Sequence, residues 1–193
     1  MNIANKLTIL RMCLIPIFVI LMMVDFNWGQ VEFLGALLSL EQLVAGIIFI
    51  FACLTDYLDG YLARKYQLIT AFGEFFDPMA DKLLVISALL LLIQKGQVAA
   101  WVVIIIVSRE LLVTGLRVLL ARSNGKVLAA ALPGKIKTTT QMLAIIFYLF
   151  NNAGFTYLPF SIADCFLYIC LFFTVYSGLD YFYHGRFVFY DVD

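Results

Sequence analysis

Charged residues are scarce in this sequence. Of its 193 residues only 13% are charged, whereas 64% are hydrophobic, and the mean hydropathy is +0.99. A soluble globular domain has about a quarter of its residues charged, so this composition excludes such a domain and also excludes a disordered chain. The chain has only 4 cysteines, too few for a disulfide scaffold. The composition therefore predicts an integral membrane protein.

An excess of positive charge is missing as well, because 13 Lys and Arg balance 13 Asp and Glu. Affinity for nucleic acid comes largely from neutralised phosphates, so we expect no nucleic-acid partner. We expect the cysteines Cys13, Cys53, Cys165 and Cys170 to be buried free thiols, since they lie in apolar runs without Cys-x-x-Cys spacing. For His184, the single histidine, we expect an interfacial position and no catalytic role.

Long apolar stretches are abundant. A membrane-spanning helix needs about 20 largely apolar residues to cross a hydrocarbon core of about 30 Å. The stretches that qualify, some only with their flanks, are Leu7–Val24, Gln42–Leu62, Leu83–Leu92, Trp101–Leu120, Thr139–Phe150 and Leu158–Tyr181. They are continuous and do not alternate with period two, which excludes a β-barrel. We predict an all-α fold, a bundle of six transmembrane helices that forms one domain over residues 1–193.

Basic residues predict the orientation of this bundle. Those that fall on one face of a six-span bundle are Lys6, Arg11, Arg64, Lys65, Lys82, Arg122, Lys126, Lys135, Lys137 and Arg186. The opposite connections contain a single lysine, Lys95. Because cytoplasmic loops carry the positive excess, we expect both termini in the cytoplasm. The most basic connection, Ala121–Lys137, fits either this topological role or substrate binding.

Aspartates are concentrated where the second and third predicted spans meet the cytoplasm. Asp56 and Asp59 are three residues apart, and Asp77 and Asp81 are four apart, so each pair shares a helix face. Converging carboxylates repel one another unless cations or protons neutralise them. Oxygen-rich sites favour hard divalent ions, which commonly bind beside substrate phosphates. We therefore expect Mg²⁺ or Mn²⁺ here.

Small residues accompany the aspartates in a fixed order. The segment reads Asp56-x-x-Asp59-Gly60-x-x-Ala63-Arg64, then eight residues, then Gly73-x-x-x-Asp77-x-x-x-Asp81. This pattern resembles the signature of the CDP-alcohol phosphatidyltransferases at every fixed position and in its spacing. Alone, the small residues would indicate close helix packing. The resemblance implies instead a six-span membrane enzyme that takes CDP-diacylglycerol as donor.

The resemblance also implies a role for each signature residue. Asp56, Asp59, Asp77 and Asp81 would hold two divalent cations, and Asp81 would also be the general base. The residues expected to line the CDP pocket are Asp56, Gly60, Ala63, Arg64 and Gly73. A homodimer in the bacterial cytoplasmic membrane, with its active site facing the cytoplasm and in contact with membrane lipids, is implied in the same way.

Further segments resemble the phosphatidylglycerophosphate synthase branch of this family, whose acceptor is glycerol 3-phosphate. They are Asn5–Arg11, Ser108–Leu111 with Arg117, Pro133–Thr138, and Phe76–Lys82. Acceptor-phosphate candidates from these segments are Arg109, Arg117, Lys135, Lys137, Thr8 and Arg11. For several of these residues a structural role is the alternative interpretation. Arg109 and Glu110 can neutralise each other, and helix capping or orientation explains Thr8 and Arg11.

Two other functions stay open at this stage. The same chemistry can use another acceptor, such as serine, inositol phosphate or phosphatidylglycerol. Intramembrane carboxylates can also form a cation or proton pathway in a transporter. A transporter would spread its carboxylates through the bilayer and break its helices, whereas here the aspartates cluster at one end. We therefore favour the transferase.

Overall fold

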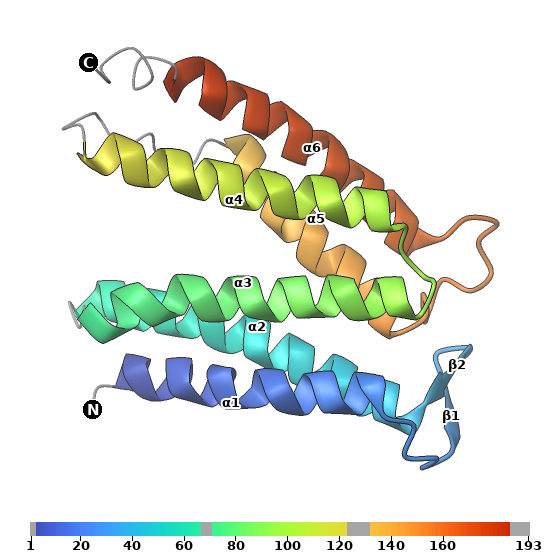
Figure 1. Cartoon of the computed structure of the whole chain (residues 1–193). Coiled ribbons are helices and arrows are strands. Elements are labelled where there is room, and N and C mark those ends of the chain that lie inside the picture. Colours follow the sequence, from blue (N-terminus) through green and yellow to red (C-terminus); the bar gives the residue numbers. More distant parts are fainter. Residues whose placement is uncertain (1–2, 67–70, 123–131, 186–193) are drawn as a thin grey trace. The chain divides into compact units, whose positions relative to one another are not determined.

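The structure is a computed structural model that describes residues 3–66, 71–122 and 132–185. Within these ranges it contains six helices and a β-hairpin, which is the predicted all-α architecture with one addition (Figure 1). The elements are α1 Ile3–Met23, β1 Gln30–Phe33, β2 Ala36–Ser39, α2 Leu40–Tyr66, α3 Ala71–Gln94, α4 Ala100–Arg122, α5 Leu132–Leu149 and α6 Ile162–Gly185.

The chain forms two compact units. The first comprises residues Met1–Gln97 and Ile145–Ser161, and the second comprises Val98–Ala144 and Ile162–Asp193. The first unit therefore holds α1, the hairpin, α2, α3 and the last turn of α5. The second holds α4, most of α5, and α6.

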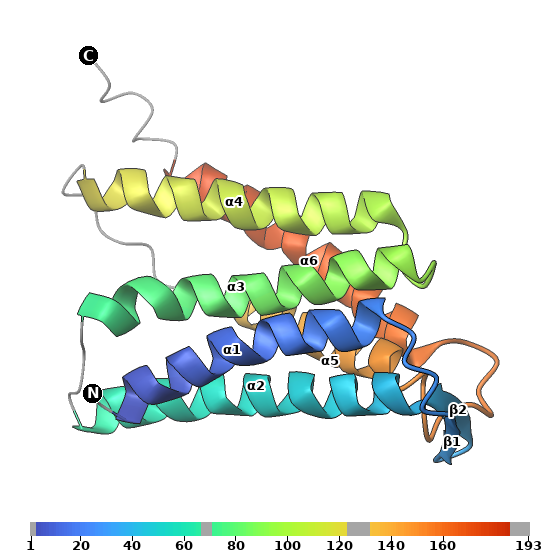
Figure 2. The same ribbon diagram turned by 60° about the horizontal axis from the view of Figure 1, so that its bottom comes forward.

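Helix α1 is central to the first unit, because it packs on both α2 and α3 (Figure 2). Phe18 of α1 and Phe49 of α2 are both 0% exposed, and their ring centroids lie 5.8 Å apart. Ala45 and Ala52, also fully buried on α2, allow the neighbouring helices to approach closely. This packing holds the C-terminal half of α1 against the N-terminal half of α2.

The β-hairpin joins α1 to α2 and was not predicted. Leu34 and Gly35 both have positive φ, as a two-residue turn between antiparallel strands requires. Ser39 then caps α2, because its Oγ accepts a hydrogen bond from the backbone N–H of Gln42 at 3.2 Å. The predicted loop is therefore a rigid connection.

Close contacts tie the hairpin region to the residues that follow α5. Leu34 O accepts the backbone N–H of Gly154 at 2.9 Å, and the Phe33 and Phe150 rings lie 5.8 Å apart. Gly46 of α2 faces the same ring, and a Cβ at Gly46 would lie 2.8 Å from Phe150. A larger residue at position 46 would therefore require the Phe150 ring to shift.

The helix boundaries correct one predicted span and extend another. α3 begins at Ala71, so it holds the signature residues in one helix with the apolar stretch Leu83–Leu92, which was predicted together with its flanks. α6 begins at Ile162 and not at Leu158. Pro159 explains the later start, since a proline disfavours helical backbone in the residue before it.

Two of the helices are long and apolar enough to cross a membrane by themselves, namely α1 over Asn5–Met23 and α6 over Ile162–His184. Many large apolar side chains are exposed, such as Ile20 on α1, Ile104 on α4 and Phe172 on α6. Such exposure is typical of surfaces that contact lipid or another protein.

The cysteines depart from the expectation of burial. All four are free, as predicted, but Cys13 and Cys165 are exposed, Cys53 is intermediate, and only Cys170 is buried. The two exposed thiols lie on α1 and α6, the helices that pass as membrane spans, and a thiol is apolar enough for such a surface.

Candidate active site

The acidic end of the first unit brings together residues from α1, α2 and α3. The Arg11 guanidinium is completely buried, and its Nη1 lies 2.6 Å from Oδ1 of Asp56. Asp56 is 33% exposed, so this carboxylate is accessible while its partner is not. Thr8, one turn before Arg11 on α1, is also fully buried. α1 therefore provides a buried positive charge directly beside the first signature aspartate.

Asp81 of α3 belongs to the same neighbourhood. The charges of Asp56, Asp81 and Arg11 all act on the thiol of Cys53, which is one turn before Asp56 on α2. Asp56 on α2 and Asp81 on α3 therefore both lie near Cys53, at the same end of this unit. Each is partly accessible to a ligand.

The other signature residues are placed by their helices alone. For these residues the structure describes the helix backbone and not the position of any side chain. They are Asp59, Gly60, Ala63, Arg64, Gly73 and Asp77. Asp59 follows Asp56 by one turn of α2, and Asp77 precedes Asp81 by one turn of α3. Among the side chains that the structure describes, no three potential metal ligands come together.

Arg11 has a partner that the expected acceptor-phosphate role does not include. We expected it among the acceptor-phosphate residues, but the structure pairs it with Asp56. A buried guanidinium beside a carboxylate offsets the repulsion that the acidic cluster creates. Arg11 and Thr8 therefore belong to the acidic end of the first unit.

The other cationic candidates lie in the second unit. Glu110 of α4 accepts a hydrogen bond from Arg109 Nη1 at 3.3 Å and a short one from Nζ of Lys137 on α5. Lys137 is 3% exposed, and a buried ammonium needs such a partner. Glu110 therefore neutralises Arg109, as expected, and also forms an ion pair with Lys137. Lys135 of α5 is exposed.

Arg117 contacts a tyrosine and, unlike Arg109 and Lys137, no carboxylate among the described residues. Its Nη2 donates a hydrogen bond to the hydroxyl of Tyr181 on α6 at 2.6 Å, and its Cζ lies 5.0 Å from the centre of the Tyr181 ring. Arg109 contacts α6 in the same way: its Nη2 donates to Ser177 Oγ at 2.8 Å. Sequence reasoning missed Ser177 and Tyr181, because α6 resembled the family only in its hydrophobic character.

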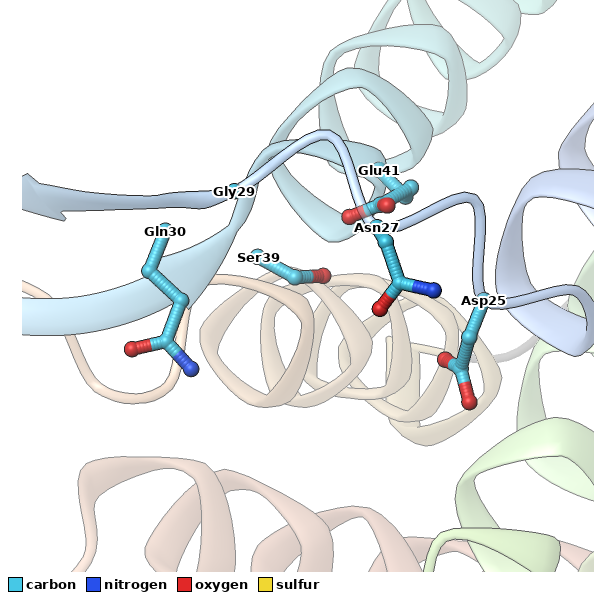
Figure 3. Close-up of a pocket in the computed structure, with 6 residues that line it drawn as sticks. All are labelled: Asp25, Asn27, Gly29, Gln30, Ser39 and Glu41. Carbon is cyan, nitrogen blue, oxygen red and sulfur yellow. The ribbon is translucent and has the colours of Figure 1, made fainter.

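A polar pocket of about 260 Å³ lies at the hairpin end of the first unit. Its lining residues are Asp25, Asn27, Gly29, Gln30, Ser39 and Glu41. Figure 3 shows Asn27 and Glu41 close together, with Asp25 and Gln30 on opposite sides. The pocket lies at the opposite end of α2 from Asp56, so it is separate from the acidic signature.

Glu41 fixes the geometry of this pocket. Its carboxylate accepts the backbone N–H of Trp28 at 2.8 Å, and this hydrogen bond holds the pKa of Glu41 below its usual value. Glu41 also lies in the first turn of α2, where the helix dipole favours a negative charge. Both effects stabilise the start of the helix.

Comparison with known proteins identifies the class of enzyme. The family model for CDP-alcohol phosphatidyltransferases matches residues 1–176, so the chain belongs to this family of transferases. A Bacillus subtilis (strain 168) protein named CDP-diacylglycerol–glycerol-3-phosphate 3-phosphatidyltransferase is 48% identical over 181 residues, which is 94% of this chain and 93% of that protein.

Proteins of the same name from other bacteria are also similar. The one from Rickettsia typhi is 36% identical over 183 residues, covering 94% of this chain and 95% of its own length. The one from Pseudomonas fluorescens is 38% identical over 187 residues, covering 94% and 88%. The family is generally dependent on divalent metal ions.

Proposed function

We propose that this protein transfers a phosphatidyl group from CDP-diacylglycerol to glycerol 3-phosphate. The primary hydroxyl of the acceptor attacks the phosphorus that carries the diacylglycerol. A new P–O bond forms as the bond to the bridging oxygen breaks, and the products are phosphatidylglycerophosphate and CMP. The observation that carries this proposal is the match to the family over residues 1–176, in a chain whose relatives are named for this reaction. The placement of the signature residues Asp56 and Asp81 near Cys53 supports it.

The proposed metal ligands are Asp56, Asp59, Asp77 and Asp81. The donor set fits Mg²⁺ or Mn²⁺, because it consists of carboxylate oxygens and its described members, Asp56 and Asp81, are accessible. Two divalent cations bound here would neutralise charge on the pyrophosphate and on the departing CMP. Arg11 supports the set from α1 by balancing part of the charge of Asp56.

The proposed CDP pocket follows the signature along α2 and α3. Its residues are Asp56, Gly60, Ala63, Arg64 and Gly73. Small residues allow a ligand to approach the helix backbone, and an arginine can bind a phosphate through two parallel hydrogen bonds, which a lysine cannot. These residue types suit a nucleotide diphosphate.

Asp81 is the proposed general base. It lies in α3 four residues after Asp77, and it is partly exposed. A base must lie within about 3 Å of the hydroxyl whose proton it takes. Asp81 would take the proton of the acceptor hydroxyl as the new P–O bond forms.

The acceptor phosphate requires positive charge. We propose that Arg109, Arg117, Lys135 and Lys137 of the second unit supply it. Thr8 and Arg11 were also candidates, but the ion pair with Asp56 favours the supporting role for Arg11. Arg117 and Lys135 are the strongest of these, because both are exposed and neither is paired with a carboxylate among the described residues.

We also propose the cellular setting that the sequence predicted. The helices form a single multi-pass domain over residues 1–193 in the bacterial cytoplasmic membrane, with both termini and the active site on the cytoplasmic side. The chain acts as a homodimer surrounded by membrane lipids. Its soluble acceptor and its lipid donor would then meet near the headgroup plane.

The reaction is tested by CMP release from CDP-diacylglycerol with the purified full-length protein. We expect release only when glycerol 3-phosphate and Mg²⁺ or Mn²⁺ are both present. Serine, inositol phosphate and phosphatidylglycerol serve as acceptor controls. Preference for one of these would refute the proposed acceptor, and full activity in excess EDTA would refute the metal site.

Topology is tested separately with two single cysteines in a chain whose four native cysteines are replaced by serine. Lys6 and Lys95 are both exposed and lie near opposite ends of the predicted bundle. With Lys6→Cys, we expect labelling by an impermeant maleimide only after the membrane is opened. With Lys95→Cys, we expect labelling of intact cells. The reverse result would overturn the proposed orientation.

A further inference from the structure

One turn of α6 contacts two arginines of α4, Arg109 and Arg117. We name Ser177, Gly178 and Tyr181 the arginine cradle. Ser177 Oγ accepts a hydrogen bond from Arg109 Nη2 at 2.8 Å, and the Tyr181 hydroxyl accepts one from Arg117 Nη2 at 2.6 Å. The two arginines are eight residues apart, or about 12 Å along the helix. The arginine cradle thus contacts two arginines that lie about two helical turns apart on one side of α4.

Gly178 and the Tyr181 ring complete these contacts. A Cβ at Gly178 would lie 3.2 Å from Cγ of Arg109, so the glycine leaves room for the arginine stem. The Tyr181 ring centre lies 5.7 Å from Cζ of Arg109 and 5.0 Å from Cζ of Arg117. Both distances are within the range of cation–π attraction, so a single ring orients two guanidinium groups.

At Arg117 the chemistry of the arginine cradle preserves positive charge, whereas Arg109 is also paired with Glu110. A hydroxyl and an aromatic ring orient a guanidinium without neutralising it, whereas a carboxylate cancels its charge. Arg117 is exposed although Tyr181 is 3% exposed. The tyrosine hydroxyl engages one of the five donors of the guanidinium. Arg117 is therefore both fixed in place and available to an anion.

We propose that Tyr181, with Ser177 and Gly178, is a positioning element for the phosphate of the acceptor. It holds Arg109 and Arg117 in the geometry that a phosphate dianion requires and does not touch the reacting atoms. This inference rests on the proposed function. All three residues lie beyond residue 176, where the match to the family model ends.

A purely structural role for Tyr181 makes a different prediction. Tyr181 packs with Val113 and Leu116 in a buried cluster, so its ring also contributes to stability. Tyr181→Phe separates the two roles, because it keeps the ring and removes the hydroxyl that Arg117 contacts. Tyr176→Phe is the matched control, since it removes an exposed hydroxyl from the same helix.

Steady-state kinetics on the purified full-length protein test the proposal. We expect Tyr181→Phe to raise KM for glycerol 3-phosphate by about tenfold, the usual effect of losing a hydrogen bond to a charged group. We expect kcat to stay within about twofold and the KM for CDP-diacylglycerol to stay unchanged. Tyr176→Phe should match the wild type. An acceptor KM for Tyr181→Phe equal to that of Tyr176→Phe would overturn the proposal, whatever its thermal stability.

A double-mutant cycle makes the test specific for Arg117. In an Arg117→Ala background, Tyr181→Phe should raise the acceptor KM no further, because the group that it positions is gone. Independent, multiplying effects would overturn the proposal. If the wild type uses glycerol 3-phosphate but Tyr181→Phe has no effect, only this inference fails. If the wild type uses only an acceptor without phosphate, the proposed function fails and the inference fails with it.

Discussion

Arg11 in the first unit and Arg117 in the second are held in opposite ways. Arg11 is completely buried and forms an ion pair with Asp56 at 2.6 Å, so its charge compensates a carboxylate of the protein itself. Arg117 is exposed and is held by a neutral phenol. The partner therefore decides the role: a carboxylate turns an arginine into a structural counter-charge, and a tyrosine keeps it available for a ligand.

The same contrast separates the two units. The first holds Asp56, Asp81 and one buried arginine, and divalent cations and the pyrophosphate are proposed to bind there. The second holds cations around Glu110 and Tyr181, and the anionic acceptor is proposed to bind there. Changes in the first unit should therefore act on turnover and stability, whereas changes in the second should act on acceptor affinity.

The largest effect is expected from Asp81→Asn in the first unit. Loss of a general base lowers kcat by about a hundred- to ten-thousand-fold. Donor binding should be partly retained, because an amide oxygen remains at that position. CMP release and CDP-diacylglycerol binding measure the two effects, with Asp25→Asn at the hairpin end as the control. Equal losses of binding and turnover would show that Asp81 only holds metal.

Arg117→Ala tests the second unit. A hydrogen bond to a charged group contributes about 1.5–3 kcal/mol, so KM for glycerol 3-phosphate should rise by about ten- to a hundredfold. Its thermal unfolding should change little, because the side chain is exposed. Lys95→Ala removes an exposed cation elsewhere and should leave KM unchanged. A fall in kcat with unchanged KM would place Arg117 outside the acceptor site.

Arg11→Met should show the reverse behaviour. Removing one partner of a buried ion pair costs about 3–5 kcal/mol, but Asp56 is 33% exposed and water compensates part of this loss. We therefore expect a loss of about 1–3 kcal/mol, measured by thermal unfolding in detergent. Acceptor KM should stay near the wild-type value in the fraction that remains folded. A stable variant with a raised acceptor KM would show that Arg11 binds the acceptor, and it would contradict the difference proposed between Arg11 and Arg117.

The smallest effect concerns Glu41, which belongs to neither charged cluster. Its pKa is lowered in the folded protein from the model-peptide value of 4.5, so the carboxylate stabilises the fold above that pH. This contribution is lost as pH falls from about 4.5 through the lower folded pKa. Glu41→Gln should thus lower the unfolding temperature at pH 7, and the difference from the wild type should shrink below pH 4.5. A difference that is independent of pH would contradict this.

Hydropathy was sufficient to predict the helices, and the spacing of the signature was sufficient to place Asp56 and Asp81 on helices. Both signals are local, because the length of an apolar run and the spacing of a motif can be read directly from neighbouring residues. That the four signature aspartates share one site stays a prediction. The hairpin was missed because its turn is Leu34-Gly35, which lacks the Asn-Gly or Asp-Gly signal of a short turn. The predicted six-span topology and its orientation stay predictions.

Pairings between distant residues could not be read from the sequence. Arg11 and Asp56 are 45 residues apart, and Arg117 and Tyr181 are 64 apart. Nothing in the α6 sequence distinguishes Tyr181 from Tyr176 or Tyr183, which are exposed. Only the packing of α6 on α4 selects one tyrosine and makes it a partner for arginine.

The contact between Gly46 and Phe150 has an evolutionary consequence. The two positions share one volume, so a methyl group at 46 either displaces the ring at 150 or is gained after that ring has been exchanged for something smaller. Unless the ring is displaced, descendants of this sequence should accept the two replacements in that order, and homologues with alanine at the first position should lack an aromatic side chain at the second.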